Sequence, residues 1–159
     1  MNKILLFFLI FIVNCSQPTP DQRNNLIEEL NLNKFRKNTY TTKFLNIFSL
    51  EKIKNDKKLT IYIEGDGVSW VDRFTPSSNP TPTDPLAFKM ALIDEGENVI
   101  YLARPCQYVW SNNCSKDIWT IAQYSSVVLD SYKEIIDHLS KKHKEIHLVG
   151  YSGGAGIAM

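Results

Sequence analysis

From residue 59 onward, short hydrophobic runs alternate with segments of helical character. The runs are 59–63, 98–103 and 145–149, and each is rich in β-branched or aromatic residues, as buried strands are. Between them, apolar residues at helical spacing predict one helix from about 85 to 95 and a long one over 116–139. Strands and helices in this order predict β-α-β units, and therefore an α/β fold with a mostly parallel sheet and helices on both faces.

The first part of the chain is less regular. A polar, proline-containing stretch follows the first apolar run, residues 26–32 have the pattern of a short helix, and residues 44–50 have that of early strands. The expected organisation is a signal peptide over 1–15, a tether with a short helix over 16–40, and the folded domain over 41–159.

The N-terminus has the pattern of an export signal. Lys3 precedes ten apolar residues, 4–13, which are fewer than the about 20 that a helix needs to cross a bilayer. A secretory signal is therefore favoured, and an uncleaved interfacial anchor is the alternative. Cys15 resembles the lipid-attachment cysteine of bacterial lipoproteins, although Asn14 stands where those signals carry a small residue. The expected location is the cell envelope, periplasmic or anchored to the membrane through lipid on Cys15.

The other two cysteines, Cys106 and Cys114, lie eight residues apart in a polar, turn-prone segment. In an oxidising compartment they can form a disulfide, which the chain-entropy model values at about 2–3 kcal/mol. Free thiols are the alternative. A zinc site is disfavoured and no metal is expected, because no second pair of ligands stands at metal-binding spacing.

Residues 150–154, Gly-Tyr-Ser-Gly-Gly, fit the G-x-S-x-G pattern of a nucleophile elbow. They follow a hydrophobic strand and precede an alanine- and glycine-rich segment, which is the strand-turn-helix setting that this motif requires. Gly150 and Gly154 would keep the sharp turn free of collisions, so that the hydroxyl of Ser152 is presented as a nucleophile. The alternative is a glycine-rich turn with an incidental serine.

A serine nucleophile also needs donors for the oxyanion. The backbone N–H of Gly153 is one candidate, because it follows the nucleophile directly. The second is expected from Gly65-Asp66-Gly67, at the end of an earlier strand, with the N–H of Asp66 favoured over that of Gly67. An ordinary turn is the alternative there.

Neither nucleic acid nor a cofactor is expected as a partner. The formal net charge is +1, and the lysines are scattered rather than gathered in a basic stripe. The glycines of 150–156 suggest a dinucleotide-binding turn, but G-x-G-x-x-G read from Gly154 would need glycine where Met159 stands. The cluster also follows the third strand instead of opening the fold.

Five motifs follow one another along the chain. They are Glu-Gly-Asp-Gly at 64–67, Asp84-Pro85, Tyr-Leu-Ala-Arg-Pro-Cys-Gln-Tyr at 101–108, Trp119-Thr120, and the elbow at 150–154. This order resembles a group of exported bacterial α/β-hydrolases over about residues 59–159. The resemblance implies a partial α/β-hydrolase fold, Ser152 as the nucleophile and a disulfide between Cys106 and Cys114.

In that fold the triad follows the order serine, acid, histidine. Seven residues follow Ser152, none of them acidic or His, and His138, His143 and His147 all precede it. We therefore expect the nucleophile half of the domain, with the C-terminal half missing and the chain inactive as it stands.

Two functions are left open. The first is an exported serine hydrolase of ester, thioester or amide bonds, with a small-molecule or lipid-like acyl substrate. The second is a non-catalytic envelope lipoprotein that keeps the scaffold as a binding module. Trp70, Phe74 and Tyr108 are candidates for the pocket wall. Arg104 would meet an anionic substrate or, as we favour, a local carboxylate.

Overall fold

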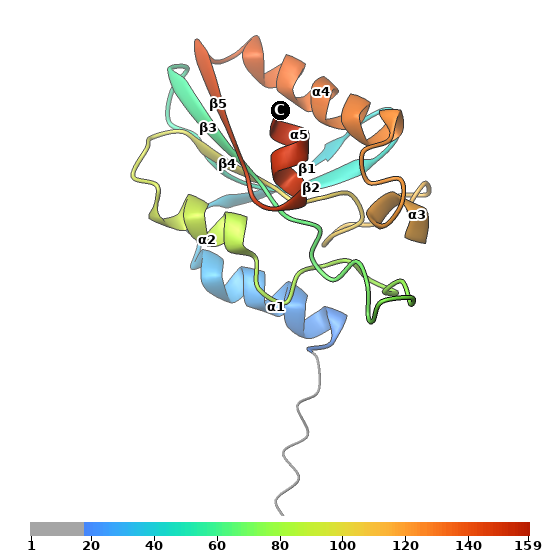
Figure 1. Ribbon diagram of the computed structural model, residues 1–159. Helices are drawn as coiled ribbons and strands as arrows, with labels where there is room; N and C mark the ends of the chain where they lie inside the picture. The colour runs from blue at the N-terminus through green and yellow to red at the C-terminus, as the bar shows by residue number, and fades with distance from the viewer. Residues whose placement is uncertain (1–17) are drawn as a thin grey trace, which may run out of the picture.

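One five-stranded sheet organises the chain, which the computed structural model describes over residues 18–159. The strand order is β1-β2-β4-β3-β5, so that β3 and β4 lie in the middle (Figure 1). The strands are β1 Arg36–Thr41, β2 Asn46–Lys52, β3 Lys58–Ile63, β4 Val99–Leu102 and β5 Glu145–Gly150. The three strands predicted from the hydrophobic runs are present as β3, β4 and β5.

The expected mostly parallel sheet, and with it the α/β class and the partial α/β-hydrolase fold, is wrong. The sheet is mixed: β3 pairs in parallel with β4 and β5, whereas β2 pairs antiparallel with both β1 and β4. The difference arises before residue 53, where β1 and β2 form a hairpin that lies along β4. The chain is therefore a small α+β domain.

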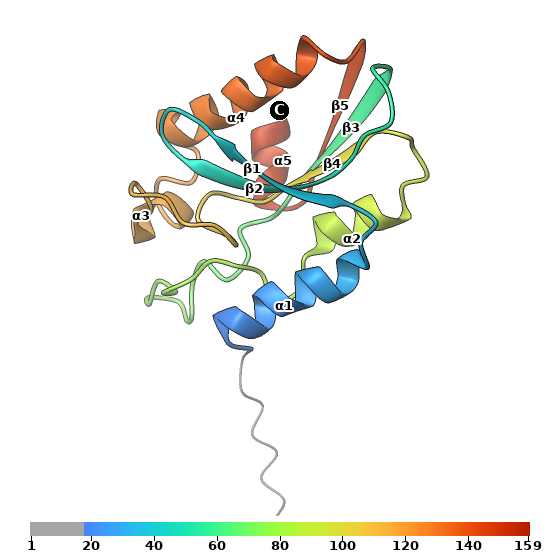
Figure 2. The ribbon, with the colours of Figure 1, turned by 180° about the vertical axis from the view of Figure 1, so that it is seen from behind.

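Helices cover both faces of this sheet (Figures 1 and 2). Helices α1 and α2 lie against one face, while α4 and α5 lie against the other. The helices are α1 Pro20–Asn31, α2 Leu86–Ile93, α3 Lys116–Trp119, α4 Ser126–Ser140 and α5 Gly153–Ala158. Alternate residues of β3 and β4 point to opposite faces, so each face has its own apolar core.

The larger core lies beneath α4. Ile61 and Ile63 of β3 pack there with the apolar side of α4, and all are almost fully buried. Tyr132 of α4 is 1% exposed, and its hydroxyl donates to the carbonyl of Ala103 at 2.7 Å. This bond fixes the helix over the end of β4, next to the segment that leads toward the predicted disulfide.

Helix α1 begins earlier than the polar composition predicts. Thr19 and Gln22 form a capping box, in which each side chain accepts from the other residue's backbone N–H. Pro20 occupies the first turn, where no donor is needed. Part of the expected tether is therefore helical.

The long helix predicted over 116–139 is wrong as a single element. It is divided into α3 and α4 by a turn that contains Gln123 and Tyr124. In that turn the carbonyl of Gln123 accepts from the guanidinium of Arg104 at 2.8 Å, and the hydroxyl of Tyr124 donates to Gly153. Side-chain periodicity carries no information about these long-range bonds.

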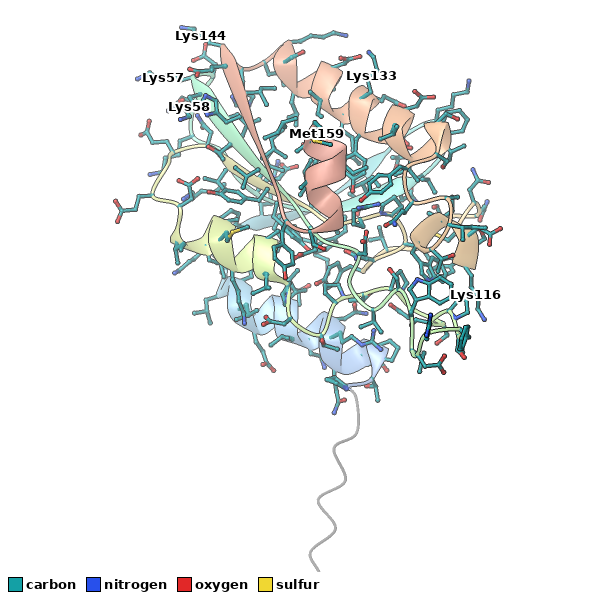
Figure 3. All side chains as sticks on the ribbon, in the orientation of Figure 1. Lys57, Lys58, Lys116, Lys133, Lys144 and Met159 are labelled. Atoms are coloured by element: carbon teal, nitrogen blue, oxygen red, sulfur yellow. A yellow bond between two sulfur atoms is a disulfide. The ribbon has the colours of Figure 1, made fainter. Side chains whose placement is uncertain are left out.

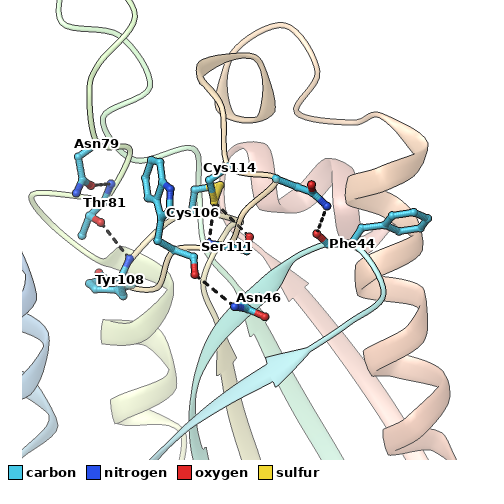
Figure 4. Close-up of a disulfide and its surroundings, with 10 residues drawn as sticks. Phe44, Asn46, Asn79, Thr81, Cys106, Tyr108, Ser111 and Cys114 are labelled. Carbon is cyan, nitrogen blue, oxygen red and sulfur yellow. Dashed lines mark hydrogen bonds between the residues drawn. A yellow bond between two sulfur atoms is a disulfide. The ribbon is translucent and has the colours of Figure 1, made fainter.

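Cys106 and Cys114 form a disulfide, as the sequence favours (Figure 4). The loop that it closes is held to the rest of the fold at both ends. The N–H of Tyr108 donates to the hydroxyl of Thr81 at 3.1 Å, and the amide of Asn113 donates to the carbonyl of Phe44 at 2.7 Å.

Within residues 18–159, no helix combines the length and the hydrophobicity needed to cross a membrane. The expected signal peptide over 1–15 and the candidate lipidation site Cys15 lie outside the described residues.

Removing a core side chain from the central strand should destabilise the fold strongly. Ile61→Ala is expected to lower the free energy of unfolding by about 2–5 kcal/mol, because Ile61 is fully buried and the resulting cavity cannot collapse completely. Thr39→Ala, at an exposed position of β1, should change it by no more than about 0.5 kcal/mol. Urea denaturation followed by circular dichroism measures both. Equal effects of the two substitutions would contradict the assignment of the core.

Candidate active site

Ser152 occupies a sharp turn between β5 and α5. Its φ of 49° and ψ of −122° lie in a region that non-glycine residues rarely adopt. The side chain is exposed, and its hydroxyl makes no hydrogen bond to the residues that the structure describes. A strained backbone that presents a free hydroxyl is the local geometry that the G-x-S-x-G pattern predicts.

The elbow glycines lie where side chains do not fit. A Cβ at Gly150 would collide with the backbone of Gly154 and Ala155, and a Cβ at Gly154 would collide with the carbonyls of Ile63 and Glu64. Gly153 lies against the carboxylate of Asp66 in the same way. These close approaches let α5 start directly above the end of β3.

The two glycine-bearing turns meet at one end of the sheet. Gly65 follows β3 and Ser152 follows β5, and these neighbouring strands run parallel. A Cβ built on Gly65 would lie 3.3 Å from the Cβ of Ser152. The N–H of Tyr151 donates to the carbonyl of Ile63 at 3.0 Å, which fastens the elbow to the neighbouring strand.

The backbone N–H of Asp66 is free and held in one direction. Gln107, which is fully buried, donates from Nε2 to the carbonyl of Gly65 at 3.0 Å. In a planar trans peptide the C=O and N–H point in opposite directions, so the N–H of Asp66 points away from Gln107. Neither this N–H nor that of Gly153 has an acceptor among the described residues.

The carboxylate of Asp66 is held by two partners. Arg104 Nη1 lies 3.0 Å from Oδ1. The side-chain amide of Gln123, oriented with its nitrogen toward Asp66, donates to the two oxygens at 2.7 and 3.1 Å. Arg104 therefore pairs with a local carboxylate, as the sequence analysis favours over an anionic substrate.

Arg104 is nearly inaccessible, because its side chain is only 4% exposed. Its guanidinium lies 5.4 Å from the ring centroid of Tyr124, whose hydroxyl donates to the carbonyl of Gly153 at 3.1 Å. One buried cation thus connects the loop after β3, the turn before α4 and the start of α5. No motif or periodicity in the sequence indicates a role in the site for Gln107, Gln123 or Tyr124. Of these, Gln107 belongs to the 101–108 segment that carries the resemblance.

A cavity of about 560 Å³ opens beside Ser152. Trp70 lines it, as expected, but Phe74 and Tyr108 do not. Its walls combine aromatic and acidic side chains with the two turns: Glu64, Gly65, Asp66, Gly67, Ser69, Trp70, Pro82, Thr83, Asp84, Leu86, Trp119, Gln123, Tyr151 and Ser152. Among the described residues this lining contains no histidine and no lysine or arginine.

The three histidines lie elsewhere. His147 pairs with Glu145 near the start of β5, and His143 lies in the turn between α4 and β5, so both lie toward the end of β5 that is opposite Ser152. His138 lies on α4 in a separate depression beside Tyr40. Lysines 57, 58 and 144 also gather where β3 and β5 begin (Figure 3). The end of the sheet at Ser152 is thus separated from these basic groups.

Glu64, directly after β3, is a buried acid for which the sequence pattern indicates no role. Its Oε1 accepts from the N–H of Gly65 at 2.9 Å and from that of Ala87 at 3.3 Å. It thereby satisfies an N–H in the first turn of α2, which has no side-chain cap of its own, while Asp84 pairs with Lys89. Burial raises the pKa of Glu64, and these N–H bonds oppose only part of the shift.

No protein-family model matches the chain, and no curated protein matches it. The resemblance to exported α/β-hydrolases therefore stays a prediction.

Glu64→Gln should remove a pH-dependent loss of stability. Because the pKa of Glu64 is higher in the folded than in the unfolded chain, the stability that its protonated form contributes is fully present below the unfolded pKa and is lost as pH rises through the folded pKa. The wild type should therefore lose stability relative to Glu64→Gln over that interval. Urea denaturation at a series of pH values measures this difference. Glu29→Gln, on the exposed side of α1, is the control and should follow the wild type; a constant difference for Glu64→Gln would contradict the assignment.

Proposed function

We propose that the chain carries the nucleophile and the oxyanion donors of a serine hydrolase acting on ester, thioester or amide bonds. The observation that supports this most strongly is the geometry of Ser152, an exposed serine at φ 49° beside two backbone N–H groups that have no acceptor within residues 18–159. A mixed sheet is compatible with such a site, since only the parallel pair β3–β5 is needed to bring the two turns together.

In the proposed reaction Ser152 Oγ attacks the carbonyl carbon of the substrate, and its proton passes to a base. The carbonyl oxygen gains negative charge, which the N–H groups of Asp66 and Gly153 would stabilise. When the tetrahedral intermediate collapses, the bond to the leaving group breaks, the leaving group takes a proton and an acyl-serine remains. Water then hydrolyses the acyl-serine and restores the hydroxyl.

The base is the missing part of this scheme among the described residues. The cavity contains carboxylates but no imidazole, and Asp66 is already occupied by Arg104 and Gln123. The reactivity expected of residues 18–159 is therefore that of a preorganised but weakly activated serine. The proposed substrates are small-molecule or lipid-like acyl compounds.

The disulfide supports the proposed location in the cell envelope, because disulfides persist in oxidising compartments. A lipid on Cys15 would make the protein an envelope lipoprotein, and membrane attachment through that residue belongs to the same proposal.

A fluorophosphonate probe should label Ser152 in the folded chain. Attack by Oγ forms a phosphorus–oxygen bond and releases fluoride, and the phosphoryl oxygen takes the position of the oxyanion. Since one oxyanion donor is worth about 10²–10³ in rate, labelling at Ser152 should exceed that at exposed Ser78 by about 100-fold. Peptide mass spectrometry over time measures both rates. Ser152→Ala should leave only the slow reactions, and equal rates at the two serines in the folded chain would contradict the proposal.

Gln107→Met should weaken both the fold and the labelling. It leaves the carbonyl of Gly65 and the N–H of Arg104 without their partners in a buried site, which costs about 1–3 kcal/mol of stability per group, whereas the carbonyl of Pro80 keeps the N–H of Val68. It also frees the peptide that directs the N–H of Asp66, so labelling at Ser152 should slow by about 10-fold or more.

Asn46→Leu is the matched control for this substitution, because the amide of Asn46 also donates to a carbonyl of the disulfide loop, that of Trp110, yet lies outside the cavity lining. The labelling rate of Asn46→Leu should equal that of the wild type. A folded Gln107→Met protein that is labelled at the wild-type rate would show that Gln107 does not position the donor.

A second candidate function is a binding module without catalysis, in an envelope lipoprotein. The position of Asp66 favours it: the carboxylate lies against Gly153, and its negative charge opposes a developing oxyanion there. In this case the cavity would bind ligands equally well in wild type and Ser152→Ala, and the probe would not select Ser152.

A further inference from the structure

The loop between β3 and α2 carries a small hairpin beside the cavity. Trp70 forms an antiparallel bridge with Pro76, and the N–H of Val71 donates to the carbonyl of Thr75 at 2.9 Å. Its base is closed by a bond from the N–H of Ser77 to the carbonyl of Ser69, also at 2.9 Å. We call residues 70–75 the hairpin tip.

Large apolar side chains of the hairpin tip face solvent. Phe74 is 81% exposed, Val71 69% and Trp70 44%. Elsewhere in residues 18–159, no five consecutive positions contain three exposed large apolar side chains. Isolated exposed apolar residues need no explanation, but a cluster on a protruding turn marks an interaction surface.

Some of the polar groups of the tip are paired within the turn, and its two charges are of opposite sign. Asp72 Oδ1 accepts from the N–H groups of Phe74 and Thr75 at 2.8 and 2.9 Å. The guanidinium of Arg73 lies 5.6 Å from the ring centroid of Phe74, and its charge cancels that of Asp72. A tip without net charge, with two turn donors satisfied and an indole beside it, suits the boundary between lipid headgroups and acyl chains, where Trp is enriched.

The start of the described chain is held beside the same loop. Arg23 of α1 donates from Nε to the carbonyl of Pro18 at 3.0 Å, and from Nη1 to the carbonyls of Asn79 and Thr81 at 3.1 and 2.7 Å. Figure 1 shows the N-terminal end of α1 (blue) near this loop (green). Arg23 therefore ties Pro18 to the segment that closes the hairpin.

The apolar run 4–13 is close to this point along the chain. Five residue steps connect Val13 to Pro18, so the two lie within about 17 Å of each other; three steps connect Cys15 to Pro18, which limits that distance to about 10 Å. Attachment to a membrane through either the run or a lipid on Cys15 would therefore bring the bilayer to the side that carries the hairpin tip.

We propose that the hairpin tip inserts Val71 and Phe74 into the interface of a lipid bilayer, with Trp70 at headgroup level. Trp70 also lines the cavity beside Ser152, so the bound surface would lie next to the cavity entrance. The proposal does not depend on catalysis by Ser152, and Ser152→Ala should bind in the same way.

The test places a single reporter indole in the tip of the full-length chain. Phe74→Trp is made in a background of Trp70→Phe and Trp110→Phe, and Ile93→Trp in the same background is the matched control. Ile93 and Phe74 are similarly exposed, at 80% and 81%. Ile93, however, is the last residue of α2 and lies away from the hairpin tip, at the edge of the sheet where β3 and β4 begin. Buried Trp119 contributes equally to both proteins. The probe is a neutral phosphatidylcholine vesicle whose acyl chains carry bromine, a quencher of indole emission.

We expect the emission of the indole introduced by Phe74→Trp to shift to shorter wavelength when vesicles are added, and most of its intensity to be lost when the vesicles are brominated. The emission of the indole introduced by Ile93→Trp should keep both its wavelength and its intensity. Because the N-terminal segment is present in both proteins, binding through that segment alone leaves both indoles unquenched and overturns the proposal. Equal quenching of the two, or no binding to vesicles, overturns it as well. A shift that grows with protein concentration without vesicles would identify a second copy of the chain as the occupant instead.

Discussion

The close packing of α5 on the end of β3 is the constraint on which the rest of the site depends. Backbone meets backbone there, because Gly154 lies against the carbonyls of Ile63 and Glu64 with no room for a side chain. The parallel register that pairs Ile63 with Gly150 places the two turns side by side. A larger residue at 154 would push the helix outward, and the hydroxyl of Ser152 would move away from the N–H of Asp66. Glycine is therefore required at 154 because α5 lies so close to the end of β3, and not only because of the backbone conformation of the turn.

Three buried polar side chains hold the loops around this contact in place. Arg104, Gln107 and Glu64 are each almost fully buried, and each bonds to backbone groups of the loops around the cavity. Burying charged and polar groups is unfavourable unless their partners are well placed, so such a framework is a weak source of stability. These side chains instead hold the loops around the cavity in one arrangement, although the loops contain little regular secondary structure. The same groups make the site sensitive to changes some distance from the reacting atoms.

The sequence predicts the central elements of this fold better than their assembly. The strands at 59–63 and 98–103 have strong hydrophobic signals because both of their faces are covered, and they are present as β3 and β4. The strand at 145–149 is present as β5, but it lies at the edge of the sheet and is only partly buried. Strand β2 has an apolar pattern at 44–50, but its hairpin partner β1 has none, since β1 reads Arg-Lys-Asn-Thr-Tyr-Thr and is mostly exposed. Without it, the antiparallel half of the sheet could not be foreseen, and the fold class was wrong.

The candidate site shows the same division. A local motif predicts the turn at Ser152, and strand order predicts that the turn near Asp66 lies at the same end of the sheet. The groups that hold these turns come from distant segments: Gln107 is 42 residues from Gly65, and Tyr124 is 29 residues from Gly153. No periodicity links such pairs, so they emerge only from the folded structure. The division of the predicted long helix at Gln123 has the same cause.

The backbone on either side of Gln107 has a consequence for how this segment can change. Cys106 and Tyr108 both adopt positive φ, at 66° and 61°, a conformation that glycine would accept more readily. Glycine at 106 would relieve the backbone but sever the covalent link to Cys114, and glycine at 108 would remove the ring that packs 4.9 Å from Phe48. A glycine that relieves the backbone at either position therefore removes a contact that holds the segment in place. The backbone conformation favours glycine at 106 and 108, whereas the side-chain contacts require the residues that are present.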